Sequence, residues 1–97
     1  MATFITLAKW TQKGIENVKD SPARLESFKK GMQSMGGALK AFYMVTGQYD
    51  MVIITEAPDA ETVAKVILAT GSKGSVSTET FHAFTEDEYK KIIAGLP

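Results

Sequence analysis

The sequence predicts an α+β domain in which four antiparallel strands form one sheet and two helices cover one of its faces. Segments rich in β-branched and aromatic residues alternate with segments whose apolar residues recur at helical spacing. A short link over residues 47–50 joins the second and third strand segments and predicts an antiparallel hairpin. The 97 residues leave room for one hydrophobic core, so residues 1–97 are expected to form a single domain.

The first part of the chain predicts one strand and one helix. The strand covers Thr3 to Trp10, and residues 11–20 are expected to form a connecting loop with one helical turn. A helix then starts at Ser21-Pro22, because a serine hydroxyl caps a free N–H and proline at the first helical position loses no hydrogen bond. Gly36-Gly37 ends this helix. Its inward face consists of Leu25, Phe28, Met32 and Met35.

The middle of the chain predicts three strands and a second helix. The strands cover Ala38 to Thr46, Met51 to Glu56 and Val76 to Phe84. The helix lies between the last two strands, begins at Pro58-Asp59 and closes near Gly71. Its inward residues are Val63, Val66 and Ile67.

A final helix follows the fourth strand. Thr85 and Glu88 form a capping box, and the acidic residues of the first turn suit the positive end of the helix dipole. The element order is therefore βαββαβ with an extra C-terminal helix. This order predicts a ferredoxin-like fold with both long helices on one face of a four-stranded antiparallel sheet. The apolar side of the final helix consists of Tyr89, Ile92, Ile93 and Leu96.

Both faces of the predicted sheet are apolar. Ile5 and Leu7 alternate with Phe4 and Ala8 in the first strand, and the third strand, from Met51 onward, is apolar in both registers. In the second strand the pattern places Leu39 and Tyr43 on the face opposite Phe42. An exposed apolar face of this size is rare on a monomer, so we expect a homodimer or higher homo-oligomer. The competing interpretation is that the C-terminal helix folds across the open face.

Composition excludes several classes of protein. Eleven basic residues balance eleven acidic ones, so neither nucleic acid nor an anionic membrane surface is an expected partner. The N-terminus lacks the pattern of a secretory signal, and the apolar runs are too short to span a bilayer. With no cysteine, one histidine and no cofactor motif, we expect no metal, no cofactor and a cytoplasmic location.

The turn Gly47-Gln48-Tyr49-Asp50 resembles the G-x-Y-D turn of the GYD-domain family. The resemblance covers essentially the whole chain and implies the dimeric α/β-barrel arrangement, in which two ferredoxin-like sheets pack face to face. It implies no assigned activity, since this family is functionally uncharacterised. The other residues that carry the resemblance are Trp10-Thr11, Gly14-Ile15, Asn17 to Asp20, Pro22, Arg24-Leu25, Gly36-Gly37, Glu56 to Asp59 and Ala83-Phe84.

Five residues are candidates for a ligand site: Trp10, Tyr43, Tyr49, Asp50 and His82. In a structural interpretation of the turn, Gly47 permits a positive φ, Asp50 can accept hydrogen bonds from loop N–H groups and Tyr49 packs beside the hairpin. In a functional one, Tyr49 and Asp50 lie at the mouth of a pocket between sheet and helix. His82 is either a general base in a cavity or a solvent-facing strand residue. Trp10 and Tyr43 line a pocket, or belong to the core or an interface.

Three functions remain open from the sequence. The first is a homo-oligomer that binds a small apolar or amphipathic molecule, between sheet and helices or at the subunit interface. The second is a cofactor-independent isomerase or monooxygenase that uses His82 as its base. The third is a purely structural or interaction protein. The loop Gly71 to Ser75 lacks the spacing of a phosphate-binding motif, although its N–H groups and Lys73 could hold an anion weakly.

Overall fold

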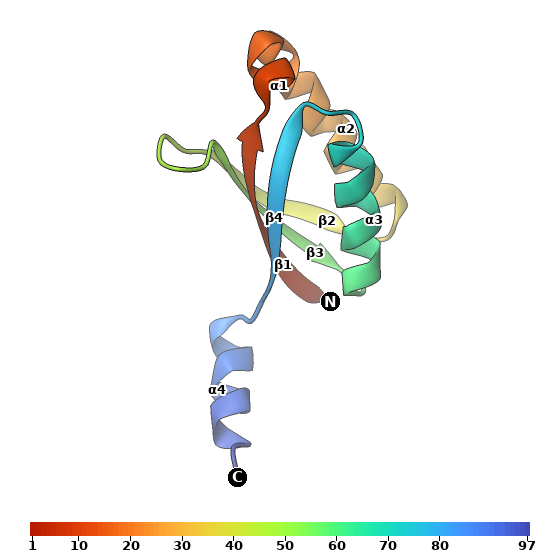
Figure 1. Cartoon of the computed structure of the whole chain (residues 1–97). Helices are drawn as coiled ribbons and strands as arrows, with labels where there is room; N and C mark the ends of the chain where they lie inside the picture. Colours follow the sequence, from red (N-terminus) through yellow and green to blue (C-terminus); the bar gives the residue numbers. More distant parts are fainter.

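The computed structural model describes residues 1–97 and has the ferredoxin-like architecture that the sequence predicts (Figure 1). One sheet has the strand order β2-β3-β1-β4, and each neighbouring pair is antiparallel. The strands are β1 (Ala2–Trp10), β2 (Ala38–Met44), β3 (Met51–Ala57) and β4 (Val76–Ala83). The helices are α1 (Gln12–Glu16), α2 (Ser21–Ser34), α3 (Ala60–Gly71) and α4 (Glu86–Ala94), with a 3-10 turn over Val18–Asp20.

The hydrophobic core lies between the sheet and the two long helices, α2 and α3, which pack on the same face (Figure 1). Met32 of α2 is fully buried at its centre, as its helical spacing predicts. On the same face the hydroxyls of Thr6 and Thr80 are hydrogen-bonded at 2.9 Å, whereas the buried hydroxyl of Thr55 has no partner. The core cluster consists of Phe4, Phe28, Met32, Ile53, Ala57, Val63 and Val66.

A bulge in β2 changes one predicted alternation. The register shifts between Leu39 and Ala41, so Lys40 is an extra residue opposite β3. Leu39 therefore packs against the core together with Phe42, and does not share a face with Tyr43 as the strict two-residue period predicted. Ala41 and Tyr43 lie on the other face of the sheet.

Residues 11–20 are more helical than the sequence predicts. They form α1 and the 3-10 turn in place of a loop with one helical turn. The Thr11 hydroxyl caps α1 by accepting a hydrogen bond from the backbone N–H of Gly14 at 3.2 Å. Gly14 packs so closely on the carbonyl group of Ser75 that a Cβ atom at this position would overlap it. This contact holds α1 against the start of β4.

The prediction that Ser21 caps α2 is wrong. Ser21 is the first helical residue, Asp20 occupies the N-cap position, and no side chain caps this end. The Ser21 hydroxyl instead accepts a hydrogen bond from the indole N–H of Trp10 at 3.3 Å. Because Trp10 ends β1, this bond ties the start of α2 to the preceding strand. The other end agrees with the prediction, since Gly36 has a φ of 82° just beyond the helix.

α4 projects from the end of the sheet (Figure 1). Its predicted capping box is present: Glu88 N donates to the Thr85 hydroxyl at 3.2 Å, and Thr85 N donates to the Glu88 carboxylate at 2.8 Å. The helix continues away from the domain and gives the molecule a length of 51 Å. The competing interpretation, in which this helix covers the open face of the sheet, is therefore wrong for the single chain.

Candidate functional site

The sheet face turned away from α2 and α3, here called the open face, has an apolar centre. Strand pairing aligns its residues in two adjacent rows that cross all four strands. The residues at its two edges, Tyr43 and Phe81, are 59% and 46% exposed. The first row is Ala41, Ile54, Ile5 and Phe81, and the second is Tyr43, Val52, Leu7 and Glu79.

Charged residues border this apolar centre. At one corner Lys40 and Glu56 form an ion pair at 4.0 Å. At the opposite end the Tyr49 hydroxyl donates to the Glu79 carboxylate at 3.3 Å, and the Lys9 ammonium lies 5.4 Å from the centre of the Tyr49 ring. An apolar centre inside a polar rim is the usual anatomy of a protein–protein interface.

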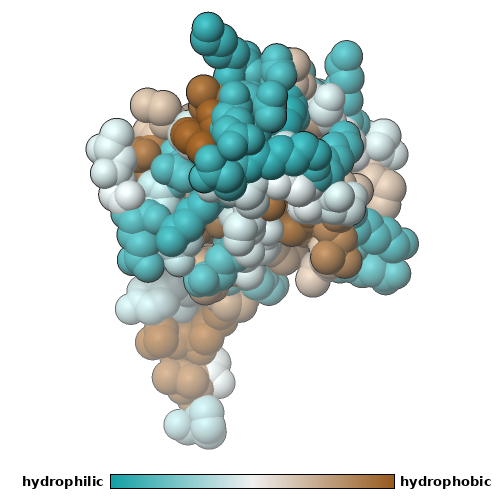
Figure 2. Space-filling model, turned by 45° about the horizontal axis from the view of Figure 1, so that its top comes forward, coloured by the Kyte–Doolittle hydropathy of each residue, from teal (hydrophilic) through white to brown (hydrophobic).

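α4 presents a second unpartnered apolar surface. Brown apolar atoms run along this projecting helix in Figure 2, and no residue of α4 is buried. Three acidic residues occupy its first turn, and Lys90 pairs with Glu86 at 3.0 Å on the polar side. The helix is therefore amphipathic but covers nothing in its own chain. Its exposed apolar residues are Tyr89, Ile92 and Ile93, followed by Leu96.

The G-x-Y-D turn has a structural role that differs from the predicted one. Gly47 does not have a positive φ, and the space around it is open. Asp50 accepts a hydrogen bond from the backbone N–H of Trp10 at 3.0 Å, and its own N–H donates to the carbonyl of Ala8 at 2.9 Å. The carboxylate thus anchors the turn to the end of β1, a strand distant in the sequence, and not to N–H groups of its own loop.

Tyr49 belongs to the rim of the open face. The Glu79 carboxylate raises the pKa of this phenol above its ordinary value of 10.0, mainly through its charge, with smaller effects of burial and of the hydrogen bond. The phenol is therefore protonated at neutral pH. Neither Tyr49 nor Asp50 lines the cavity between sheet and helices, so the turn does not form the mouth of a pocket there.

His82 is exposed and stacks between two phenylalanines. Its ring centre lies 5.1 Å from that of Phe4 and 4.7 Å from that of Phe84. It lines neither the groove nor the small cavity described below. His82 therefore does not lie in a water-excluding pocket, the environment that the hypothesis of a general base requires. The isomerase or monooxygenase hypothesis depends on His82 as its base, and this position does not support it.

The five candidate residues do not converge on one site. Trp10 pairs with Val76 at one end of β4, whereas His82 lies six residues further along that strand, roughly 20 Å away at about 3.3 Å per residue. Tyr43 and Tyr49 lie on the open face, and Asp50 is bonded to Trp10. Apart from the sequence neighbours Tyr49 and Asp50, only Trp10 and Asp50 are joined by a hydrogen bond, and that bond is a structural one.

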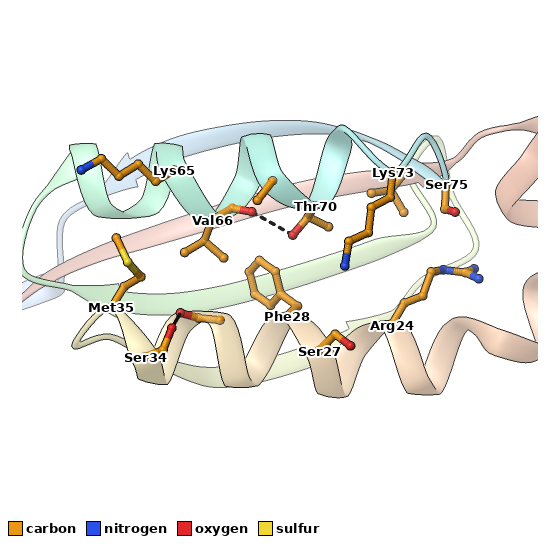
Figure 3. Close-up of a pocket in the computed structure, with 13 residues that line it drawn as sticks. Arg24, Ser27, Phe28, Ser34, Met35, Lys65, Val66, Thr70, Lys73 and Ser75 are labelled. Atoms are coloured by element: carbon orange, nitrogen blue, oxygen red, sulfur yellow. Dashed lines mark hydrogen bonds between the residues drawn. The ribbon is translucent and has the colours of Figure 1, made fainter.

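A groove of about 350 Å³ lies between α2 and α3 (Figure 3). Phe28 and Val66 point toward one another at its centre, and Arg24 of α2 and Lys73 of the loop after α3 lie at the same end. A second cavity, between the helices and the sheet, measures only about 50 Å³. The groove is therefore the larger of these two hollows.

Comparison with known proteins identifies the family. The model of the GYD domain family matches residues 4–93. The chain belongs to the GYD domain family. The glutamine synthetase and cystathionine beta-lyase binding protein of Thermus thermophilus is 39% identical to this GYD domain over 84 residues, which are 86% of this chain and 88% of that protein.

Solved structures share the fold of this GYD domain. A feast or famine regulatory protein from M. tuberculosis, solved with L-methionine, superimposes with a TM-score of 0.66 at 15% identity over 88% of this chain. This GYD domain spans only about half (51%) of that regulator. The protein TTHA0845 of Thermus thermophilus has a TM-score of 0.54 at 23% identity, over 88% of this chain and 95% of its own. At these identities the likeness concerns the fold alone.

Neither a metal cluster nor a membrane-spanning helix is found in this GYD domain. No three histidine or acidic side chains are gathered closely enough to hold a metal ion. None of the helices combines the length and apolarity needed to cross a membrane.

Sequence reasoning missed the groove between α2 and α3. Its lining residues belong to two separate helices and to the segment after α3. Apart from the inward residues Phe28, Met35 and Val66, most of them lie where the pattern predicts ordinary solvated surface. One signal was present in the sequence: Gly31 and Ala69 are small residues in otherwise well-formed helices. That signal becomes interpretable only when the two helices are known to lie side by side.

Proposed function

We propose that this GYD domain is a homo-oligomeric binding protein that acts through protein–protein contacts, and that two copies pair through their open faces. The observation that carries the proposal is the apolar centre of the open face. Four strands about 4.8 Å apart and about eight residues long make a face of roughly 500 Å². Two such faces bury about 1,000 Å² together, which reaches the size of a specific interface.

A second copy of the chain suits the open face electrostatically. The rim carries both signs, with Lys9 and Glu79 at one end and Lys40 and Glu56 at the other. The net charge of the chain is zero, so two copies meet without overall repulsion. Face-to-face packing of the two sheets would produce the dimeric α/β barrel that the family resemblance implies.

We further propose that the dimer binds metabolic enzymes. The Thermus relative is named for binding glutamine synthetase and cystathionine beta-lyase, and its 39% identity over most of both chains supports a shared role. α4 is the element best suited to this contact, because an amphipathic helix with a free apolar side docks into grooves of partner proteins. A dimer carries two such helices, and two linked contacts raise the apparent affinity.

A small apolar or amphipathic ligand at the dimer interface is the second candidate function. The exposed aromatic side chains of Tyr43 and Phe81 favour it, since aromatic residues commonly line ligand pockets. A ligand between the sheet and the helices is not favoured, because that cavity of about 50 Å³ is far below the roughly 300 Å³ of the smallest typical ligand pockets.

Native mass spectrometry of the purified protein tests the dimer and the ligand together. We expect a dimer or a higher multiple of the chain. Extra mass that leaves with the dimer would support the second candidate function. A protein that remains monomeric at micromolar concentration would refute pairing through the open face.

Biolayer interferometry tests the binding of enzymes. The immobilised full chain is exposed to purified glutamine synthetase and cystathionine beta-lyase from its own organism, with an unrelated enzyme as control. We expect saturable binding of at least one of the two, lost in a variant that carries Ile92→Glu and Ile93→Glu. Leu68→Glu is the matched control, because Leu68 is equally apolar and 72% exposed but lies on α3. If wild-type protein binds neither enzyme, the proposed role is wrong.

A further inference from the structure

We infer that the groove between α2 and α3 binds a small organic anion with an apolar tail, whose carboxylate or phosphate headgroup contacts Arg24 and Lys73. The groove lies between helices that pack on the opposite side of the sheet from the open face (Figures 1 and 3). A dimer formed through the open face leaves it accessible. The inference therefore goes beyond the proposed function, and anion binding can be tested independently of dimer formation.

The charges that line the groove are all positive. Its thirteen lining residues include Arg24, Lys65 and Lys73 and no aspartate or glutamate. Lys65 is paired with Glu61 at 3.4 Å and points away at the far end (Figure 3). Lys73 forms no salt bridge, and Arg24 donates only to backbone carbonyl groups. Two cationic side chains without a counter-charge therefore lie at the same end of the groove, which favours an anion there.

The side chains at the Arg24 end of the groove are preorganised to bind an anionic headgroup. The Arg24 guanidinium is held by the carbonyl oxygens of Asn17 at 3.1 Å and Gly14 at 3.5 Å. A guanidinium has five N–H donors, so donors remain for a ligand, and little side-chain freedom is lost when it binds. The hydroxyls of Ser27 and Ser75 line the same groove and form no hydrogen bond within the chain.

The backbone of the Gly71 to Ser75 loop contributes less than a phosphate-binding loop does. The N–H groups of Ser72, Lys73 and Gly74 donate to carbonyl oxygens of Leu68, Thr70 and Gly71. They are consumed in closing α3 and cannot hold an anion. Recognition of the headgroup therefore rests on side chains, which act equally on a carboxylate and on a phosphate.

The rest of the groove suits an apolar tail. Phe28 and Val66 form its centre, and Met35 lies at the end opposite Arg24 (Figure 3). Gly31 leaves the groove open between them, since a Cβ atom there would lie 3.6 Å from Cγ1 of Val66. From Arg24 to Met35 the helix rises about 16 Å, and the volume of about 350 Å³ lies within the range of small-molecule sites.

The absence of a carboxylate restricts the class of ligand. A free amino acid would bring an ammonium group for which the groove has no acceptor of opposite charge. A carboxylic acid without an amino group, or a phosphate monoester, meets only complementary charges. The inferred ligand is thus an anionic amphiphile and not a zwitterion.

Titrations followed by ¹H–¹⁵N NMR test the inference with four probes that share a six-carbon chain. The probes are hexanoate, hexyl phosphate, hexylamine and norleucine. We expect saturable shifts of lining residues, among them Phe28, Val66 and Thr70, with hexanoate or hexyl phosphate. The tighter of these two identifies the headgroup. Hexylamine and norleucine are expected to bind at least about 10-fold more weakly, because each brings an ammonium group close to the two cations.

Variants locate the binding. Lys73→Gln is expected to weaken the tighter anion about 5-fold, the effect of one exposed charge, and Lys30→Gln on the same side of the molecule to leave it unchanged. Gly31→Leu fills the groove and is expected to abolish binding, with Gly31→Ala as the control for folding. If Gly31→Leu fails to fold, the affinity of Lys73→Gln for the anion still shows whether the anion binds in the groove.

Three results would overturn the inference: no saturable shift with either anion, equal binding of hexylamine, or shifts confined to the open face. The oligomeric state is measured on the same samples by sedimentation. A dimer that binds no anion would refute only the anion site in the groove. A monomer that binds anions would refute only the pairing of two copies through the open face.

Discussion

Ile5→Glu is the most informative perturbation of the proposed dimer. Ile5 lies in a central strand, between Ile54 and Phe81 in the wholly apolar row of the open face. In the single chain it is half-buried, so a glutamate there can reach water. The cost to the folded monomer is then limited to strand preference and lost contacts, about 1 kcal/mol. In a dimer paired through this face, each copy carries the substitution into the interface.

The effect on the dimer is several times larger. Full burial of an isoleucine side chain is worth about 1.5–3 kcal/mol, and half of it is already gained in the monomer, so the two copies lose about 2 kcal/mol together. Each unpaired carboxylate in the interface adds at least about 1 kcal/mol more. A total near 4 kcal/mol raises the dimer dissociation constant about 1,000-fold.

Sedimentation velocity over a range of concentrations measures this constant. Leu68→Glu is the matched control, since Leu68 is an exposed aliphatic residue of α3 outside the open face, and it is expected to leave the constant unchanged. Circular dichroism confirms that both variants are folded. A folded Ile5→Glu protein with an unchanged dissociation constant would refute the reasoning, because the copies would then pair through another surface.

Three further predictions concern the single chain. Thr55→Val is expected to raise the free energy of unfolding by about 1 kcal/mol, because it removes a buried hydroxyl that has no partner. Urea unfolding checks this, with Thr6→Val, which breaks a hydrogen bond, as the destabilising comparison. Gly14→Ala is expected to lower the same free energy by about 1–3 kcal/mol, because the methyl group overlaps the Ser75 carbonyl, and an unchanged urea midpoint would contradict this. The hydrogen bond from Thr85 N lowers the pKa of Glu88 below its ordinary value of 4.5, so the cap stabilises α4 fully above that pH and is lost as the pH falls through the lowered pKa. The Cα chemical shifts of α4 should lose helical character over that range, and Glu88→Gln, which removes the titrating carboxyl group, should remove this pH dependence.

The secondary structure follows from the sequence because its signals act between residues close together in the chain. Gly36 ends α2 with a positive φ, the Asp59 side chain caps α3, and Thr85 and Glu88 form the capping box of α4. Alternation within β1 likewise predicts two apolar sheet faces, and the structure shows both. Where such a local rule failed, a distant partner was the cause: the Ser21 hydroxyl bonds to Trp10 and leaves α2 uncapped.

The positions of the candidate site residues relative to one another could not be predicted from the sequence. Residue type marks Tyr49 and His82 as capable of chemistry, but the tertiary structure places Tyr49 on the rim of the open face and His82 in an exposed aromatic stack. The groove between α2 and α3 required two helices far apart in the chain to lie side by side, so that Arg24 of α2 and Lys73 of the loop after α3 line the same end. Local patterns determine which elements form and which of their sides are apolar. Only tertiary packing decides which side chains meet, because those distances are set by contacts between segments that the chain order separates.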